Sequence, residues 1–176
     1  TFHKNKNKSQ EIIKDFKPEF AYVEDRSTFE DLKDTSDITF INGDSSLKEL
    51  IEHDDVDVII SAISGFAGLK ATYLAASTGK KILLANKESI VAGGDLITAR
   101  AKKFNSKIIP IDSEHNAIFQ CLSGQRSPDD VQNITITASG GPFIGKKISD
   151  LKDVTKDDAL NHPNWDMGSK ISIDSA

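Results

Sequence analysis

KIIPIDSEHNAIFQCL, residues Lys107–Leu122, places an apolar run, two carboxylates and a helical pattern in immediate succession. The run Ile108–Ile111 is typical of a strand, Asp112 and Glu114 follow it, and apolar residues then recur at helical spacing. In open α/β sheets, ligands bind at the edge where strands end and helices begin. Oxygen ligands suit a hard divalent cation, so the two carboxylates suggest a site for Mg²⁺ or Mn²⁺. A second interpretation is a helix N-cap, in which Asp112 or Ser113 satisfies free backbone N–H groups, and the two interpretations are compatible.

Strand-like and helical segments alternate through the chain up to this stretch. The strand-like segments are Phe20–Val23, Ile38–Ile41, Val56–Ile60, Lys81–Ala85 and Lys107–Ile109. The helical segments are Lys8–Asp15, Thr28–Lys33, Ser45–Glu52, Gly65–Ser77 and one that ends at about Phe104. This alternation predicts βαβ units and an α/β fold with a Rossmann-like, doubly wound parallel sheet.

Three finer predictions concern single segments of this region. Val56–Ile60 is largely apolar, so we expect a strand that is buried on both faces. Asp44 or Ser45 is expected to cap the helix Ser45–Glu52. Cys121, the single cysteine, falls on the apolar side of its predicted helix, which favours core packing over a role as nucleophile or metal ligand.

The pattern changes after Leu122. Ser123–Asp130 is polar and contains a proline, which is typical of a boundary between domains. Asn133–Ala138 alternates apolar and polar residues, as a strand with one polar face does, and Lys170–Asp174 alternates in the same way. We therefore expect a Rossmann-like domain over residues 1–122 and the start of an α+β catalytic domain over residues 123–176. Both ends look cut from a longer protein.

The composition argues against several classes of protein. A net charge of -5 disfavours a general nucleic-acid-binding protein, because such proteins carry a basic face. No apolar run approaches the roughly 18 residues of a membrane span, and no secretory signal is present. A single cysteine cannot build a disulfide framework, which fits a reducing, cytosol-like compartment. We therefore expect no nucleic-acid partner and no membrane partner.

Polar residues also follow the predicted strand Lys81–Ala85. Asn86–Glu88 would lie at the same sheet edge as the two carboxylates, with Lys87 as a positive charge for an oxyanion or carbonyl. The alternative is an exposed helix start. Ser139–Gly141 offers a hydroxyl and open backbone N–H groups that can bind phosphate, although such turns are also common without a ligand.

Two further segments carry distinctive residues. His162–Gly168, HPNWDMG, contains the only tryptophan and the only methionine of the chain. Its Pro and Gly suggest a mobile loop, in which Trp165 and Met167 would form an apolar lid over a substrate. The alternative is a hydrophobic staple that pins a connector to the core. Thr1–Lys8 is basic and could accept the 2′-phosphate of NADP in a Rossmann-type fold, or it could be a solvated run of charges.

Together these clusters resemble one family, 1-deoxy-D-xylulose 5-phosphate reductoisomerase of the non-mevalonate isoprenoid pathway. The matching strings are LLANKESIVAGG (Leu83–Gly94), IPIDSEHNAIFQCL (Ile109–Leu122), TASGGPF (Thr137–Phe143) and HPNWDMGSKISIDSA (His162–Ala176). Upstream, the βα pattern and the string SAISGFAGL are similar but less specific. The resemblance covers the whole chain, whereas the chain covers less than half of such an enzyme.

The resemblance implies roles for individual residues. Asp112 and Glu114 would be two of three carboxylate ligands of Mg²⁺ or Mn²⁺, and both would be catalytic, as would Lys87 and His162. The substrate-binding residues would be Lys87, Ser113, Glu114, Ser139, His162, Trp165, Met167 and Ser175. The residues that bind NADPH would be His3, Lys4, Asn5, Asn86, Glu88 and Gly168.

The resemblance also implies a reaction. The metal would act as a Lewis acid on 1-deoxy-D-xylulose 5-phosphate, the carbon skeleton would rearrange, and NADPH would reduce the resulting aldehyde to 2-C-methyl-D-erythritol 4-phosphate. The full enzyme would be a homodimer in a bacterial cytoplasm or a plastid-type organelle. Because the family's Gly-rich turn and third metal ligand fall outside this sequence, the 176-residue chain alone is expected to be nearly inactive. The alternatives are a non-catalytic α/β binding module and a related NADP-dependent dehydrogenase.

Overall fold

The computed structural model describes residues 1–35, 37–124, 127–137, 140–166, 168–174 and 176. The chain divides into two compact units, residues 1–124 and residues 125–176. Among the described residues, the strands all belong to the first unit, and the second unit contains short helices and 3-10 turns.

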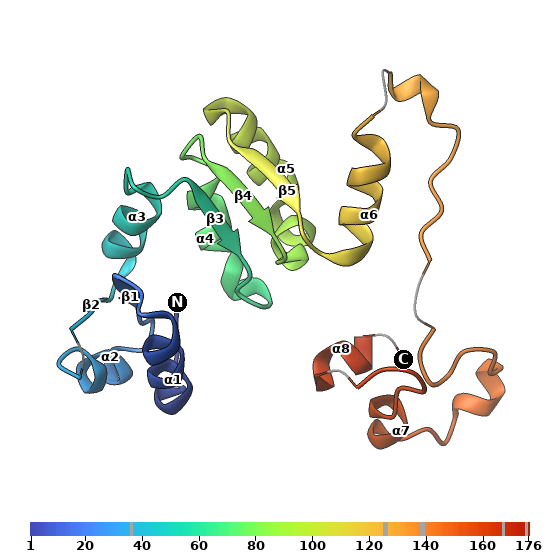
Figure 1. Ribbon diagram of the computed structural model, residues 1–176. Coiled ribbons are helices and arrows are strands. Elements are labelled where there is room, and N and C mark those ends of the chain that lie inside the picture. Colours follow the sequence, from blue (N-terminus) through green and yellow to red (C-terminus); the bar gives the residue numbers. More distant parts are fainter. Residues whose placement is uncertain (36, 125–126, 138–139, 167, 175) are drawn as a thin grey trace. The chain divides into compact units, whose positions relative to one another are not determined.

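The first unit begins with a two-stranded parallel sheet (Figure 1). Its elements are α1 (Lys6–Phe16), β1 (Phe20–Tyr22), α2 (Arg26–Leu32) and β2 (Thr39–Ile41). Phe20 pairs with Thr39, and Phe2 forms an isolated parallel bridge with Val23. Parallel strands that are joined through a helix are the βαβ arrangement predicted from the alternating sequence.

The second sheet of this unit has the strand order β3–β4–β5, and all of its pairs are parallel. Its elements are α3 (Asp44–Glu52), β3 (Val58–Ser61), η1 (Phe66–Gly68), α4 (Leu69–Ala75), β4 (Lys81–Leu84), α5 (Lys87–Phe104), β5 (Lys107–Pro110) and α6 (Ser113–Leu122). Ser61 pairs with Leu84, and Leu84 pairs with Pro110, so the three strands end at one edge. The predicted α/β class is confirmed.

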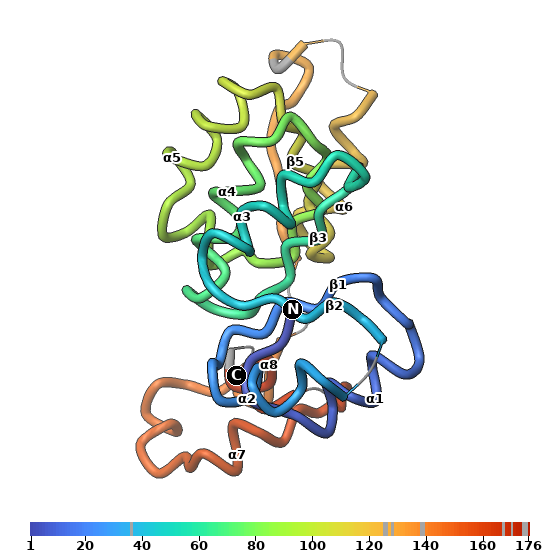
Figure 2. The backbone as a smooth tube through the Cα atoms, turned by 90° about the vertical axis from the view of Figure 1, so that its left-hand side faces the viewer, coloured from blue at the N-terminus to red at the C-terminus, as the bar shows by residue number. Residues whose placement is uncertain are grey.

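The hydrophobic core lies on one face of this second sheet. Ile59, Ile82 and Ile108 are paired neighbours across the three strands, and they pack in a cluster with Ile97 and Ala101 of α5. Figure 2 shows α4 and α5 on the same side of the strands. Ile82 and Ile97 are fully buried. Removal of this apolar surface from water therefore stabilises the packing of the helices on the sheet.

The other face of β3 corrects a prediction. Val58 is 42% exposed and Ile60 is 65% exposed, so β3 is not buried on both faces in this chain. Successive side chains of a strand point to opposite faces. Ile59 therefore packs in the core cluster while Val58 and Ile60 point away from it.

Three more predictions about local structure are wrong. The N-cap of α3 is Gly43, with φ 93°, because glycine adopts this backbone conformation without steric strain. Cys121 is exposed and does not pack in a core, and no other residue of α6 is buried either. Residues 133–137 form no strand in the described part of the chain, where no neighbouring strand pairs with them, and Ile134 and Ile136 are more than half exposed.

The second unit contains η2 (Pro128–Asp130), η3 (Ile148–Leu151), α7 (Lys156–Leu160) and α8 (Ser169–Asp174). The alternating segment Lys170–Asp174, which was expected to be a strand, lies in the helix α8, so that prediction is also wrong. Among the described residues of this unit, the buried ones are Gly141, His162 and Ser172. Within the part of the chain that the structure describes, no helix is both long and apolar enough to cross a membrane.

Candidate active site

Two helix caps stand side by side where β4 and β5 end. Asn86 caps α5, and its Oδ1 accepts a hydrogen bond from the backbone N–H of Ser89 at 2.9 Å. Asp112 caps α6, and its Oδ1 accepts from the backbone N–H of His115 at 3.4 Å. The predicted capping role of Asp112 is confirmed. Because β4 and β5 are paired in register, both caps lie at the sheet edge where ligands bind in folds of this kind.

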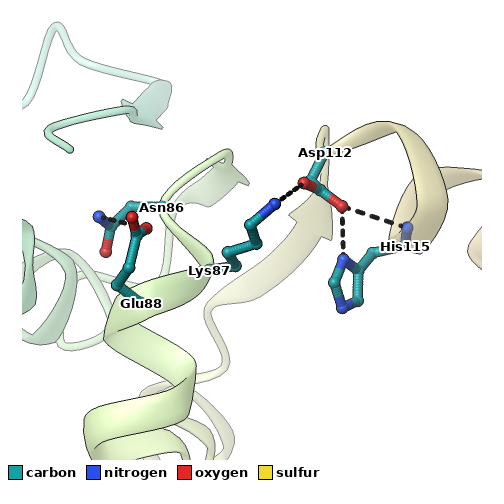
Figure 3. Close-up of polar contacts among 5 residues, drawn as sticks. All are labelled: Asn86, Lys87, Glu88, Asp112 and His115. Atoms are coloured by element: carbon teal, nitrogen blue, oxygen red, sulfur yellow. Dashed lines mark hydrogen bonds and ion pairs between the residues drawn. The ribbon is translucent and has the colours of Figure 1, made fainter. Parts of the chain in front are cut away.

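The carboxylate of Asp112 joins the two helix starts (Figure 3). Lys87, the first residue of α5, places Nζ 3.1 Å from Asp112 Oδ2. His115 places Nδ1 2.5 Å from Asp112 Oδ1. A carboxylate only accepts hydrogen bonds, so His115 carries its proton on Nδ1. Sequence reasoning did not single out His115, although its position three residues after a capping aspartate was a usable signal.

The pKa values of this pair reflect the contact. Desolvation by burial acts most strongly on Asp112 and would raise its pKa, but the hydrogen bonds from His115 and Lys87 and the charge of Lys87 outweigh it. The pKa of Asp112 therefore falls to about 2. The hydrogen bond to Asp112 raises the pKa of Lys87. At neutral pH the pair is consequently a carboxylate and an ammonium group.

The donor set of this tip suits a hard cation only in part. Asp112 and Glu114 lie on one helix start and offer carboxylate oxygens, the ligands that Mg²⁺ and Mn²⁺ prefer. Among the residues that the structure describes, no three His, Cys, Asp or Glu side chains are arranged to hold a metal ion. At this tip the described residues therefore supply two carboxylates, and water or other ligands would fill the remaining positions around a cation.

Asn86 belongs to a buried polar network and is itself 2% exposed. Its Nδ2 donates to the carbonyl oxygens of Ile63 and Gly65, the latter at 2.9 Å, and to Glu88 at 3.2 Å. Its Oδ1 accepts from Ser89, as described above. Asn86 thus ties the loop after β3 to the start of α5.

Three buried hydroxyls extend this network. Ser61 Oγ lies 2.6 Å from Thr72 Oγ1, and Thr72 Oγ1 lies 3.3 Å from Ser89 Oγ. Gly68 comes close to the network, since a Cβ there would lie 2.5 Å from the carbonyl oxygen of Ile63. The loop after β3 is therefore held tightly against α5.

A cavity of about 850 Å³ opens beside that loop. Its lining includes His3, Glu24, Ile63, Ser64 and Lys70. Glu24 follows β1 closely and Ile63 follows β3, so the cavity lies near the ends of parallel strands, where Rossmann-type folds bind dinucleotides.

The predicted cofactor residues of the first unit do not all lie at this cavity. His3 lines it. Lys4 instead lies 4.0 Å from Asp25, and Asn5 caps α1 through a hydrogen bond from the backbone N–H of Lys8 at 3.0 Å.

His162 is the distinctive buried group of the second unit. It is 9% exposed, and its Nδ1 accepts from the backbone N–H groups of Asn164 at 3.2 Å and Trp165 at 3.1 Å. Its Nε2 is buried without a hydrogen-bond partner among the described residues. A buried polar atom that lacks a partner is costly, so this nitrogen points to a ligand or group that completes the site.

The remaining predicted site residues have mixed outcomes. Ser113, Glu114, Trp165 and Gly168 are exposed, and Glu88 is half-buried. Ser139, Met167 and Ser175 lie outside the described residues. The structure thus brings together Lys87 and Asp112 with the adjacent Ser113 and Glu114, and it leaves the roles of all these residues as predictions.

Two family models match the chain. The model of 1-deoxy-D-xylulose 5-phosphate reductoisomerase matches residues 1–94, and the model of the C-terminal domain of the same enzyme matches residues 108–176. This chain belongs to the 1-deoxy-D-xylulose 5-phosphate reductoisomerase family. The resemblance predicted from the four strings is confirmed.

Individual members of the family are similar throughout the chain. A 1-deoxy-D-xylulose 5-phosphate reductoisomerase of Francisella tularensis subsp. novicida is 47% identical over 179 residues, which cover 100% of this chain and 46% of the relative. The enzyme of that name from Clostridium botulinum is 42% identical over 99% of this chain and 46% of the relative. The chain therefore spans about half the length of the curated relatives it matches.

Solved structures give the same result for the fold. A crystal structure of DOX-P reductoisomerase in complex with NADPH, fosmidomycin and magnesium matches with a TM-score of 0.85 and 39% identity, over 99% of this chain and 46% of that one. The enzyme from Zymomonas mobilis in complex with NADPH matches with a TM-score of 0.83 and 38% identity, over 99% and 45%. The predicted Rossmann-like class is confirmed by these matches.

Proposed function

We propose that this chain forms the NADPH-binding part, and the beginning of the catalytic part, of an enzyme that converts 1-deoxy-D-xylulose 5-phosphate to 2-C-methyl-D-erythritol 4-phosphate. The observation that carries the proposal is family membership over both units, combined with the Lys87–Asp112 tip at the ends of β4 and β5. Relatives that share the fold hold NADPH, magnesium and fosmidomycin.

Asp112 and Glu114 would hold Mg²⁺ or Mn²⁺, together with a third ligand from outside this chain. When bound, the cation supplies Lewis-acid polarisation of the substrate's oxygens. Asp112 now shares its carboxylate with Lys87, so a cation at this carboxylate competes with the lysine. Lys87, once released, would present its ammonium group to substrate oxygens at the same sheet edge, and His115 would keep the carboxylate oriented.

NADPH would bind in the cavity beside the loop after β3. His3 lines this cavity, and Asn86 and Glu88 lie next to the loop at the start of α5. Lys4 and Asn5 follow His3 directly and would contribute backbone groups or rearranged side chains near the adenosine phosphate. The expected role of Gly168 along the cofactor is part of the same proposal.

The phosphorylated sugar would meet Ser113, Lys87 and Glu114 at the acidic tip, and His162 in the second unit. Ser139 and Ser175 would bind its phosphate. Trp165, which is 61% exposed, and Met167 would close over the bound substrate and exclude water. We further propose that the full-length enzyme is a homodimer, that it has no nucleic-acid or membrane partner, and that it works in a bacterial cytoplasm or a plastid-type organelle.

The chain alone is expected to show little or no turnover, so the test uses a chimaera. This chain replaces the matching 179 residues of the Francisella relative, and NADPH oxidation is followed with 1-deoxy-D-xylulose 5-phosphate and Mg²⁺. Asp112→Asn and Glu114→Gln should each lower kcat/KM by more than about 100-fold, because each removes a charged ligand of the cation that polarises the substrate's oxygens.

Asp157→Asn is the matched control, because Asp157 is also an acidic residue in the first turn of a helix and is exposed. It should change kcat/KM less than about twofold, since single surface substitutions rarely matter. Retained turnover in both tip variants would refute the metal-site assignment. A chimaera without any substrate-dependent oxidation would favour the binding module instead.

A further inference from the structure

His162 is fixed by the backbone of its own loop. Asn164 and Trp165 each direct a backbone N–H at Nδ1, at 3.2 Å and 3.1 Å. A backbone N–H can only donate a hydrogen bond, so Nδ1 must be the acceptor and cannot carry a proton. The single proton of the neutral ring is then on Nε2.

The buried Nε2 is the part of the ring left for a ligand. It is shielded from solvent and has no hydrogen-bond partner among the residues that the structure describes. An N–H group in such a position is stable only when an acceptor completes it. The lone pair of the ring is already used at Nδ1, so no basic nitrogen faces the ligand.

We propose that the backbone amides of Asn164 and Trp165 hold His162 as the Nε2–H tautomer, so that the ring acts on an oxygen of the phosphorylated substrate as a hydrogen-bond donor and not as a base. The identity of the substrate rests on the proposed function, whereas the tautomer does not. Through the same two hydrogen bonds, the imidazole stabilises the turn between His162 and Trp165.

His115 provides an internal comparison. Its Nδ1 faces the carboxylate of Asp112 at 2.5 Å, so its proton must lie on Nδ1, the opposite arrangement to His162. NMR of the 176-residue chain labelled with ¹⁵N-histidine distinguishes the two tautomers, and His162→Asn assigns the signals by their loss. We expect an unprotonated Nδ1 and a protonated Nε2 for His162. A protonated Nδ1 in His162, or an average of the two tautomers, would overturn the proposal.

Two substitutions separate the acceptor role of Nδ1 from the donor role of Nε2. In His162→Asn, the side-chain oxygen is bonded to Cγ as Nδ1 is, so it can accept from Asn164 and Trp165, but the Nε2 donor is lost. In His162→Gln, an amide N–H can approach the position of Nε2, but the acceptor for the loop is displaced. Amide hydrogen exchange of Asn164 and Trp165 should therefore stay slow in the first variant and become fast in the second. Equal loss of protection in both would count against the turn that we propose.

Kinetics of the same variants in the chimaera test the donor role. His162→Asn should lower kcat/KM by about 10- to 100-fold, the range expected for one hydrogen bond to a charged oxygen, and His162→Gln should recover part of that loss. A His162→Asn variant with the kcat/KM of the parent, or a His162→Gln variant with a lower kcat/KM than His162→Asn, would overturn the donor role. If the parent chimaera has no turnover, the proposed function fails and the donor role fails with it, whereas the NMR result still decides the tautomer.

Discussion

Asn86 and Asp112 perform the same local task in adjacent parts of the sheet edge, yet their surroundings differ. Each follows a strand, and each caps the helix that starts next. Asn86 is 2% exposed and bonds to Ile63, Gly65, Glu88 and Ser89. Asp112 bonds to Lys87 and His115, whose side chains are 56% and 59% exposed. A cap that is bonded to other backbone segments holds the fold, whereas a cap bonded to exposed side chains can exchange those partners for a ligand.

The helices that follow these caps differ in the same way. α5 buries Ser89, Gly93, Ile97 and Ala101, whereas α6 has no buried residue. The tip at Asp112 therefore rests on a helix that this chain holds weakly. This is consistent with a site in which one side chain must be exchanged for a metal ion.

The largest expected effect is on the buried cap. Asn86→Ala leaves the carbonyl oxygens of Ile63 and Gly65 without their donor and removes the N-cap of α5. Together these losses should lower the free energy of unfolding by about 2–4 kcal/mol, measured by urea denaturation. Asn116→Ala is the control, because Asn116 lies within α6 and is not its cap. Its Nδ2 donates to one backbone carbonyl oxygen, that of Pro110 at 2.7 Å, and its Oδ1 accepts from the side chain of Gln120. Similar losses in the two variants would mean that the Asn86 network stabilises the fold no more than one local hydrogen bond does.

Substitution of Asp112, whose side chain is 14% exposed, should lower the free energy of unfolding less, and by an amount that depends on pH. The pKa of Asp112 is about 2 when folded, below the ordinary value of 3.8, so its ionised form stabilises the folded state. That contribution is present above about pH 4 and is lost as the pH falls toward 2. Allowing for screening by solvent, Asp112→Asn should cost up to about 2 kcal/mol at pH 6. The difference in stability between the parent and the variant should shrink steadily as the pH falls from 4 through 2, and a difference that stays as large at pH 2 as at pH 6 would contradict the assigned cause.

The weak attachment of α6 predicts a smaller difference. Cys121 is exposed on this helix, so it should react with a thiol reagent in the folded protein at a rate within about threefold of that of an unfolded cysteine peptide. The backbone amides of α6 should exchange well before those around Ile97 in α5. A thiol that reacts only after global unfolding would mean that α6 is packed after all.

The smallest expected effect is the direct coupling of the two helix starts. Lys87 is more than half exposed, so a double-mutant cycle of Lys87→Met and Asp112→Asn should give a coupling energy of about 0.5–1 kcal/mol that falls with added salt. A coupling that is much larger and insensitive to salt would indicate that this tip is as enclosed as the Asn86 network.

Several features of the site could be predicted from the sequence because they depend on neighbouring residues. The capping aspartate at 112 and the lysine at 87 follow apolar runs, and parallel strands place their ends at one edge. The engagement of Asn86 with Ile63 and Gly65 could not be predicted, because those partners lie more than 20 residues away and are backbone atoms. The partners of His162 are the backbone N–H groups of Asn164 and Trp165, two and three residues later. They are close in the sequence, but a backbone N–H is present at almost every residue, so the sequence does not indicate this contact.

For residues 1–122 the sequence by itself determined the order of strands and helices and the parallel class of the sheet, and for the whole chain it determined the family, since these follow from periodicity and from long matching strings. Only the tertiary structure decided which face of β3 is covered, whether Cys121 is buried and whether residues 133–137 pair as a strand. Those outcomes depend on what lies opposite each segment in space. A uniformly apolar run, or an alternating one, carries no information about whether a partner element is there to cover it.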